Sequence, residues 1–241
     1  MQNLTPKQLD SFPVENGFRL RGLEMTRIEV FVDAAFAFAV TLLVISFDEI
    51  PGSFEEMVVA LKGVPAFIVS AAQLIWIWYE HNKWSRRYGL EDGMTTVLSG
   101  ALLIVVLVYI YPLRVMIEGM FTWFSGGYLP ATMSMSSFEE LGFMFVFFGI
   151  GFTVLSLVFL LMYWHAVRCK EQLALNPVEL FQSRMLFMLW LGFAVIGGVA
   201  IALALLVPTA LMPWAGFAYV LLSMWGLTVH TYSNLHKPVG S

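Results

Sequence analysis

The sequence has little charge and almost no cysteine. Only 12% of its 241 residues are charged, against about 25% in ordinary soluble domains. The single Cys169 excludes an internal disulfide and any site built from several cysteines. A formal net charge of −4 gives no support for nucleic-acid binding. Apolar residues make up 59% of the chain, and its mean hydropathy is +0.77. These values indicate an all-α, polytopic membrane protein whose surroundings are a lipid bilayer.

The motifs of several function classes are also missing. The sequence contains neither H-E-x-x-H nor G-x-S-x-G, so we expect no enzyme and no cofactor. It lacks the T-V-G-Y-G loop of the ordinary potassium filter; Gly126-Gly127-Tyr128 is interpreted as a turn with an interfacial tyrosine. A secondary transporter would need helix breaks in two related halves, and Gly197-Gly198 has no clear counterpart. The transporter and a packing or anchoring role remain alternatives to a channel.

Six runs of about 20 mostly apolar residues are long enough to cross a bilayer as helices. They lie at Ile28–Phe47, Met57–Trp78, Thr95–Leu113, Leu141–His165, Met185–Val207 and Leu211–Tyr232. The polar start of the chain contains no signal-peptide-like run, and a short surface helix is predicted near Thr5–Phe12. The chain is therefore divided into an N-terminal segment (1–27), a six-helix membrane domain (28–232) and a short tail (233–241).

The distribution of basic residues predicts the orientation. With the N-terminus in the cytoplasm, the outer side carries Lys62 and Arg114 alone, and the other basic residues lie inside. Six crossings then return the C-terminus to the cytoplasm. The inner basic residues are Lys7, Arg19, Arg21, Arg27, Lys83, Arg86, Arg87, Arg168, Lys170, Arg184 and Lys237.

The first apolar run contains an ionisable residue, Asp33. A carboxylate at this depth costs several kcal/mol unless it is paired or lines water. Trp78 and His81, at the end of the second run, lie in the same leaflet and offer N–H donors. We therefore predict a polar cluster of Asp33, Trp78, His81 and Arg27, which favours a packing role over direct binding of ions or protons.

The first run has two distinct faces as a helix. At about 100° per residue, one side carries Asp33, Val40 and Val44. Alanines make this helix thin, so other helices can approach closely. The default interpretation of the opposite, apolar stripe is contact with lipid or with a symmetry mate. That stripe comprises Phe38, Leu42 and Ile45, flanked by Thr41.

These residues also resemble a known family. Arg27-x-x-x-Phe31-Val32-Asp33, followed by an alanine-rich helix ending in Thr41-Leu42, resembles the opening helix of the bacterial relatives of the lysosomal potassium channel. That family carries R-x-x-x-F-S-D at this place. The segment Trp78-x-x-His81 is similar to the family's W-x-x-H stretch, and the six-run layout also fits.

The resemblance implies a homotetramer in the bacterial inner membrane, with a central pore lined by the first helix of each subunit. It implies a channel for monovalent cations that favours K⁺, with a hydrophobic constriction and no other metal. A proton-permeable channel and a secondary transporter are the alternatives. The implied pore positions are Phe38, Thr41, Leu42 and Ile45, and the implied network that holds the helix is Arg27, Phe31, Asp33, Trp78 and His81.

Two positions depart from the family pattern. Val32 stands where the motif has serine, which removes one hydroxyl group from the implied network. Phe38 stands where the family usually has isoleucine or leucine. Four phenylalanine rings at a constriction would close it or shift it by one helical turn.

Overall fold

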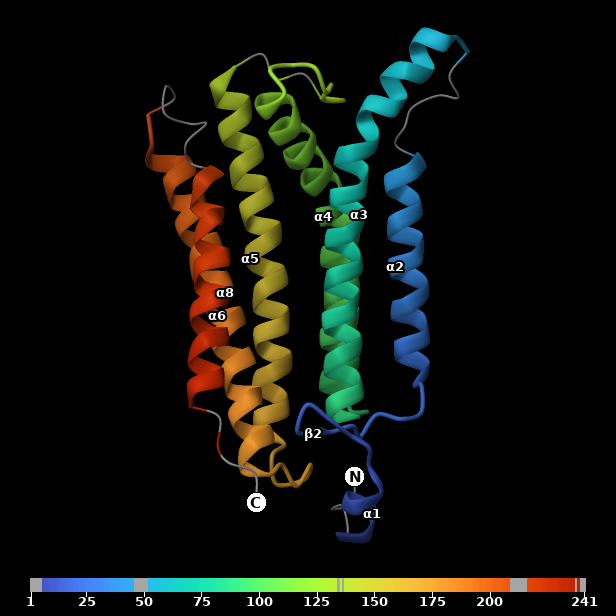
Figure 1. Ribbon diagram of the computed structural model, residues 1–241, viewed down its shortest axis with the longest axis vertical. Helices are drawn as coiled ribbons and strands as arrows, with labels where there is room; N and C mark the ends of the chain where they lie inside the picture. Colours follow the sequence, from blue (N-terminus) through green and yellow to red (C-terminus); the bar gives the residue numbers. More distant parts are fainter. Residues whose placement is uncertain are drawn as a thin grey trace.

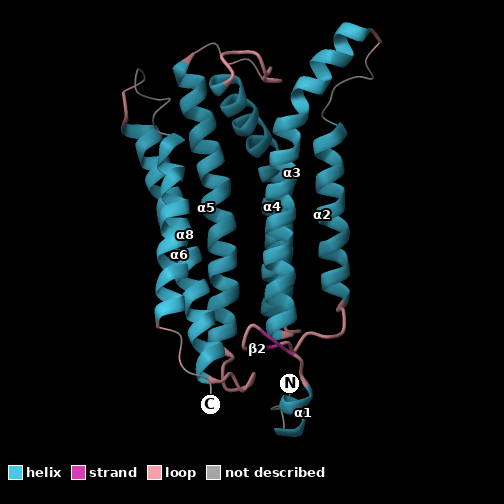
Figure 2. Ribbon diagram, in the orientation of Figure 1, coloured by secondary structure: helices cyan, strands magenta, loops and turns pink. Residues whose placement is uncertain are grey.

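The computed structural model describes residues 6–45, 52–133, 135, 137–208, 216–236 and 238. Six helices run side by side along the long axis of the molecule (Figure 1). Within the described residues, the rest consists of loops, two short helices and one small hairpin near one end (Figure 2). The six helices are α2 (Arg27–Ile45), α3 (Phe54–Tyr88), α4 (Gly93–Phe124), α5 (Phe138–Arg168), α6 (Pro177–Leu206) and α8 (Val220–Leu235).

Four of these helices, α3 to α6, are long and apolar enough to cross a membrane. The helical membrane architecture predicted from composition is therefore confirmed at this level. α2 carries three charged residues within its 19, and α8 is 16 residues long. The short 3₁₀ helix η2 (Gly216–Tyr219) leads into α8, and the predicted start of the sixth run at Leu211 lies outside the described residues.

The helices extend beyond the apolar runs because polar residues cap their ends. Three helices begin after a residue whose side chain accepts a hydrogen bond from the backbone N–H of a glutamate three positions later. These pairs are Ser53 with Glu56, Ser137 with Glu140, and Asn176 with Glu179. Each helix therefore continues into regions that the hydropathy pattern alone assigned to loops.

The predicted end of the third run at Leu113 was wrong. α4 continues to Phe124, so Arg114 and Glu118 lie on the helix instead of in an outer loop. The Nε of Arg114 donates to Oε1 of Glu118 at 2.6 Å, and both side chains are buried. The two opposite charges lie one helical turn apart and compensate each other. The helix can therefore continue through this region.

The N-terminal segment contains a β-hairpin that the all-α prediction missed. β1 (Val14–Glu15) pairs antiparallel with β2 (Phe18–Arg19). Asn16 and Gly17 connect the strands with φ values of 53° and 80°. Positive φ at both central residues is typical of a type I′ turn, for which Asn-Gly is a preferred sequence. The Asn-Gly pair was the signal available in the sequence. The predicted short helix is confirmed as α1 (Pro6–Ser11).

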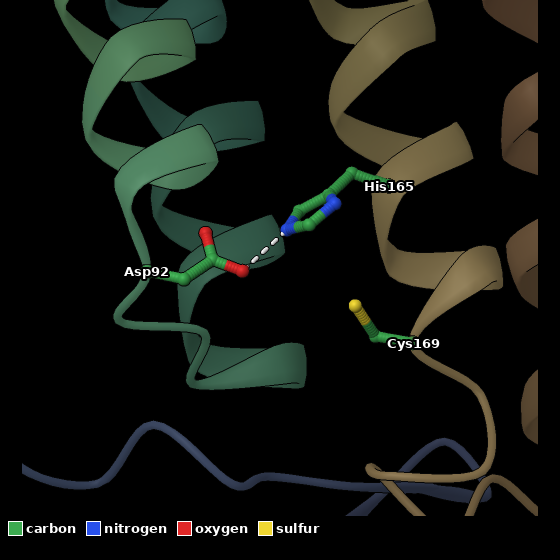
Figure 3. A group of neighbouring side chains, drawn as sticks. All are labelled: Asp92, His165 and Cys169. Atoms are coloured by element: carbon green, nitrogen blue, oxygen red, sulfur yellow. Dashed lines mark hydrogen bonds and ion pairs between the residues drawn. The ribbon is translucent and has the colours of Figure 1, made fainter. Parts of the chain in front are cut away.

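α4 begins at a capping residue that also contacts α5. Oδ1 of Asp92 accepts from the backbone N–H of Thr95 at 2.8 Å, and Oδ2 lies 2.7 Å from Nε2 of His165 (Figure 3). Partial burial opposes ionisation of Asp92, but the hydrogen bonds from Thr95 and His165 outweigh it and lower the pKa of this carboxyl group. The start of α4 is thereby joined to the last turn of α5.

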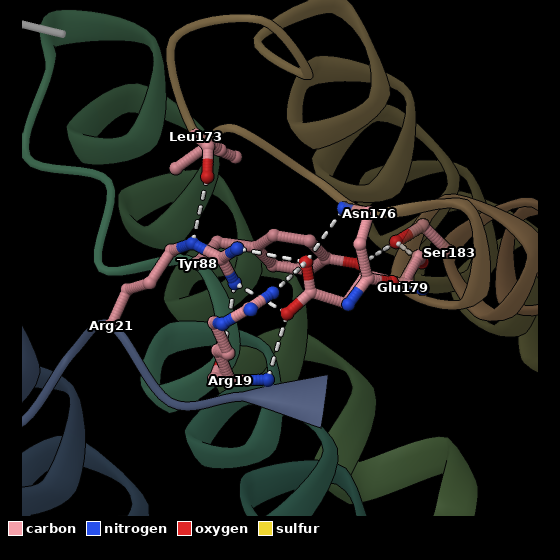
Figure 4. Close-up of polar contacts among 7 residues, drawn as sticks. All are labelled: Arg19, Arg21, Tyr88, Leu173, Asn176, Glu179 and Ser183. Carbon is pink, nitrogen blue, oxygen red and sulfur yellow. Dashed lines mark hydrogen bonds and ion pairs between the residues drawn. The ribbon is translucent and has the colours of Figure 1, made fainter. Parts of the chain in front are cut away.

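A buried ion pair holds the hairpin against the helices (Figure 4). The guanidinium of Arg21 donates to both oxygens of Glu179, at 3.2 and 2.9 Å, and its Nε donates to the carbonyl of Leu173 at 2.9 Å. Glu179 is fully buried and also accepts from the backbone N–H of Arg19 at 2.8 Å. Charge-assisted, two-pronged contacts of this kind are among the strongest hydrogen bonds in proteins.

The segment between the hairpin and α2 crosses the end of α3 at very close range. The backbone N–H of Gly22 donates to the carbonyl of Arg86 at 3.0 Å. A Cβ atom at Gly22 would lie 2.5 Å from the carbonyl oxygen of Ser85, so a larger residue would push this segment away from α3. Close docking here fixes where α2 starts.

Candidate pore helix

α2 presents one face to the rest of the chain and leaves the other exposed. The buried side packs against α3 and α4 and into the main core. It comprises Val32, Phe36, Ala39 and Leu43. On the other side, exposed residues recur along the helix with the spacing of one helical face. They are Arg27, Val30, Phe31, Ala34, Ala37, Phe38, Thr41 and Val44. Phe38, which is 56% exposed, lies near the middle of this face.

The observed exposed face of α2 overlaps the predicted apolar stripe but is rotated relative to it about the helix axis. Phe38 and Thr41 are exposed as expected, whereas Leu42 is half-buried and packs against the core. Val44, predicted on the same side as Asp33, is 48% exposed. Asp33 is half-buried at the edge of the exposed face. The side chain of Ile45 lies outside the described part of the structure. The rotation follows from the packing of α2 on two helices, which periodicity alone does not specify.

The first of three polar contacts holds the start of α2. The backbone N–H of Thr26 donates to Oε2 of Glu29 at 2.6 Å, and the N–H of Glu29 donates to the Thr26 hydroxyl at 3.2 Å. This reciprocal pair is a capping box. The hydroxyl of Ser85 on α3 donates to the other oxygen of Glu29. One carboxylate therefore caps α2 and also joins it to α3.

The second contact lies about one turn further along α2. Nε1 of Trp78 on α3 donates to Oδ1 of Asp33 at 2.7 Å, as the motif pair predicts. Among the described residues, the ring of His81 has a different hydrogen-bond partner: its Nε2 lies 3.1 Å from the hydroxyl of Ser99 on α4. His81 is buried and joins α3 to α4. The predicted cluster therefore contains two separate hydrogen bonds, made by residues three positions apart on α3.

The third contact is near the other end of α2. Nη1 of Arg114, on α4, donates to the backbone carbonyl of Leu43 at 3.3 Å. The carbonyls in the last turn of a helix have no partner within it, so an external cation satisfies one of them. Glu118 compensates the charge of Arg114 and also accepts from the backbone N–H of Thr132 at 2.9 Å.

Two members of the predicted network do not take part in it. Arg27 is exposed, and its side chain makes no hydrogen bond or ion pair with the residues that the structure describes. Phe31 is 62% exposed and lies on the outward face of α2. Val32, where the motif has serine, is fully buried in the core cluster. Apolar packing therefore takes the place of a hydroxyl at this position.

Sequence reasoning missed Glu29 and Arg114 as anchors of α2. Glu29 could have been recognised from Thr26-x-x-Glu29, the capping-box pattern at a helix start. Arg114 had no such local signal, because its contact with Leu43 joins residues 71 positions apart.

Replacing Trp78 with phenylalanine tests the second contact. The change keeps most of the ring but removes the N–H donor, which leaves the Asp33 carboxylate with an unmade hydrogen bond. We expect a loss of about 1–3 kcal/mol in stability, measured as a lower thermal midpoint in detergent. In the Asp33→Asn background the same change should cost less, because no charge is then left unpaired. Equal losses in both backgrounds would show that the charge of Asp33 contributes little to the contact, because the asparagine oxygen can still accept the hydrogen bond.

Comparisons with known proteins place the chain in a family. Residues 27–110, which include α2 and the anchors from α3, match the model of the endosomal/lysosomal potassium channel TMEM175. A protein from Marivirga tractuosa named as a potassium channel is 36% identical over 211 residues, which cover 86% of this chain and 83% of that protein. The chain belongs to the TMEM175 family.

A solved structure agrees with this assignment along almost the whole chain. It is the crystal structure of a variant of the potassium channel MtTMEM175 in complex with a nanobody–MBP fusion protein. It is 31% identical, has a TM-score of 0.80, and covers 92% of this chain and 98% of its own. As a TMEM175-family member, the chain is a multi-pass helical membrane protein of a family of potassium channels, which are not enzymes.

The loop that superficially resembled a potassium filter is a turn. Gly126 and Gly127 have φ values of 62° and 86° and directly follow α4. Tyr128 is 67% exposed, and the amine of Lys62 lies 4.3 Å from the centre of its ring.

Proposed function

We propose that the chain forms a K⁺-favouring cation channel in which α2 of each copy lines a central pore. The observation that carries this proposal is the contrast between the two faces of α2. Polar contacts hold the helix at three points along its length, whereas Phe38 and Thr41 on the outer face are not covered by any described element of the chain. A helix fixed so firmly to its own subunit presents its free face in a defined orientation.

The composition of the exposed face suits close approach by other copies. Ala34 and Ala37 lie beside Phe38 and let neighbouring helices come near. A homotetramer with both termini in the cytoplasm, in a bacterial inner membrane, is the arrangement we propose. It would bring equivalent Phe38 rings together around the axis. Leu42 is then a supporting residue behind the pore wall, and Ile45 remains a proposed pore position at the outer end.

The proposed mechanism is a hydrophobic constriction. A ring of apolar side chains excludes water when it is narrow, and an ion cannot cross without part of its hydration shell. A small dilation lets water back in and permits conduction. K⁺ loses its shell at lower cost than Na⁺, so K⁺ is favoured. The Thr41 hydroxyl is bonded to the carbonyl of Ala37 at 3.0 Å, and its oxygen still has lone pairs to offer an ion.

Flux measurements on reconstituted protein test this proposal. Purified oligomer in liposomes should release K⁺ faster than Na⁺ under matched gradients, with a rate that does not saturate at moderate concentration. A pH-sensitive dye inside the vesicles separates K⁺ from proton permeation. Saturable flux coupled to a second ion would favour a transporter. A protein that stays monomeric in detergent and membranes would contradict the channel, because one helix cannot enclose a pore.

A further inference from the structure

Three side chains with metal-binding atoms meet where α4 begins and α5 ends (Figure 3). They are Asp92, the capping residue of α4, together with His165 and Cys169 at the end of α5. A carboxylate oxygen, a ring nitrogen and the sulfur atom all lie within 4.8 Å of one another. This group lies away from α2 and has no part in the proposed pore.

The local structure holds these three side chains close to one another without a bound ion. His165 and Cys169 are four residues apart, so the helix presents both on the same side. Asp92 is held by the bond from the Thr95 N–H to its Oδ1, which leaves Oδ2 directed at His165. The sulfur of Cys169 points toward the same pair (Figure 3). All three residues are half-buried, which limits the other conformations of their side chains.

We propose that Asp92, His165 and Cys169 bind a Zn²⁺ ion. Zinc takes nitrogen, sulfur and oxygen ligands together, at about 2.0–2.3 Å and in tetrahedral geometry. Ligand atoms in such a site lie roughly 3–4 Å apart, so the present separations need only small side-chain movements. An aspartate and a thiolate would neutralise the two charges of the ion, and water would complete the fourth position.

The bond between His165 and Asp92 by itself is the competing explanation. Such a pair would join α4 to α5 without any metal, and the sulfur atom would be incidental. The two explanations differ in what they require of Cys169: the ion pair does not need its sulfur, whereas the metal site does. Cys169 is also the single cysteine of the chain, so any thiolate signal reports on this position.

Cobalt substitution tests the site by spectroscopy. Tag-free protein, reduced and metal-free in detergent, is titrated with Co²⁺. We expect intense visible bands of tetrahedral Co²⁺ and a near-ultraviolet sulfur-to-cobalt charge-transfer band at one equivalent per chain. Added Zn²⁺ should abolish both. Visible bands without charge transfer, or the absence of both, would overturn the proposal.

Variants separate the site from other histidines. Cys169→Ser should remove the charge-transfer band and weaken Zn²⁺ binding by more than about tenfold, the size of effect seen even for outer groups of metal sites. Asp92→Asn preserves the cap of α4 and should weaken binding comparably. His230→Gln, on the exposed surface of α8, is the control and should leave binding unchanged. Wild-type affinity in Cys169→Ser would overturn the proposal, provided that the variant elutes as the same oligomer.

Discussion

Alanine in place of Phe38 is expected to raise K⁺ flux about tenfold or more and to reduce the preference for K⁺ over Na⁺. A tenfold increase corresponds to a barrier lower by about 1.4 kcal/mol, a small amount if one ring is removed from each copy in the proposed oligomer. Phe38 is exposed near the middle of the free face of α2, so its loss leaves the packing of the subunit intact. The measurement is K⁺ and Na⁺ efflux from liposomes of equal protein content.

A matched control removes the same side chain elsewhere. Phe143 is 69% exposed on α5, and Phe143→Ala should leave both rates at the wild-type level. Equal flux in Phe38→Ala and wild-type protein, with the oligomer intact, would exclude Phe38 as the constriction. A similar increase in both variants would indicate general leakiness of the membranes. Leu42→Ala is less informative, since Leu42 packs against the core and its loss also affects folding.

Glutamine in place of Glu179 should cause the largest loss of stability. The change preserves the shape of the side chain but leaves the guanidinium of Arg21, 3% exposed, without a counter-charge. Breaking a buried ion pair from one side costs about 3–5 kcal/mol. At about 2–4 °C per kcal/mol for a chain of this size, the thermal midpoint in detergent should fall by roughly 10 °C.

The control for Glu179 lies in the preceding turn. Glu171 is exposed, and Glu171→Gln removes the same charge from the same end of the molecule. Its thermal midpoint should match that of the wild type. If Glu179→Gln also melts at the wild-type temperature, the ion pair does not hold the hairpin in place. Limited proteolysis provides a second readout, since a released hairpin exposes the segment that leads into α2.

Much of the architecture could be predicted from the sequence because a bilayer restricts the segments that can cross it. About 20 apolar residues are needed to cross it, and backbone groups within it must be satisfied by a helix. Runs such as 141–165 and 185–207 therefore predicted α5 and α6. The exact ends were wrong because capping residues extend each helix beyond its apolar part, as Ser137 does for α5.

Some features had a local signal that went unused. Asn16-Gly17 is a preferred hairpin turn, and Thr26-x-x-Glu29 is a capping box at the start of α2. Both patterns involve residues within a few positions of each other. The short range of these interactions makes them readable without knowledge of the fold.

The sequence by itself determined the class of protein and the approximate helices, because hydropathy is a local property. The Asp33–Trp78 pair, 45 positions apart, was predicted from the shared leaflet of two runs and from the family resemblance. Only the tertiary structure decided which face of α2 is exposed. It decided that Arg114 donates a hydrogen bond to the backbone near the end of α2. It also decided that Arg21 meets Glu179 across 158 positions and Asp92 meets His165 across 73. Such contacts depend on how helices turn about their axes when they pack. That rotation depends on how side chains of several helices pack together, so it cannot be predicted from any one segment of the sequence.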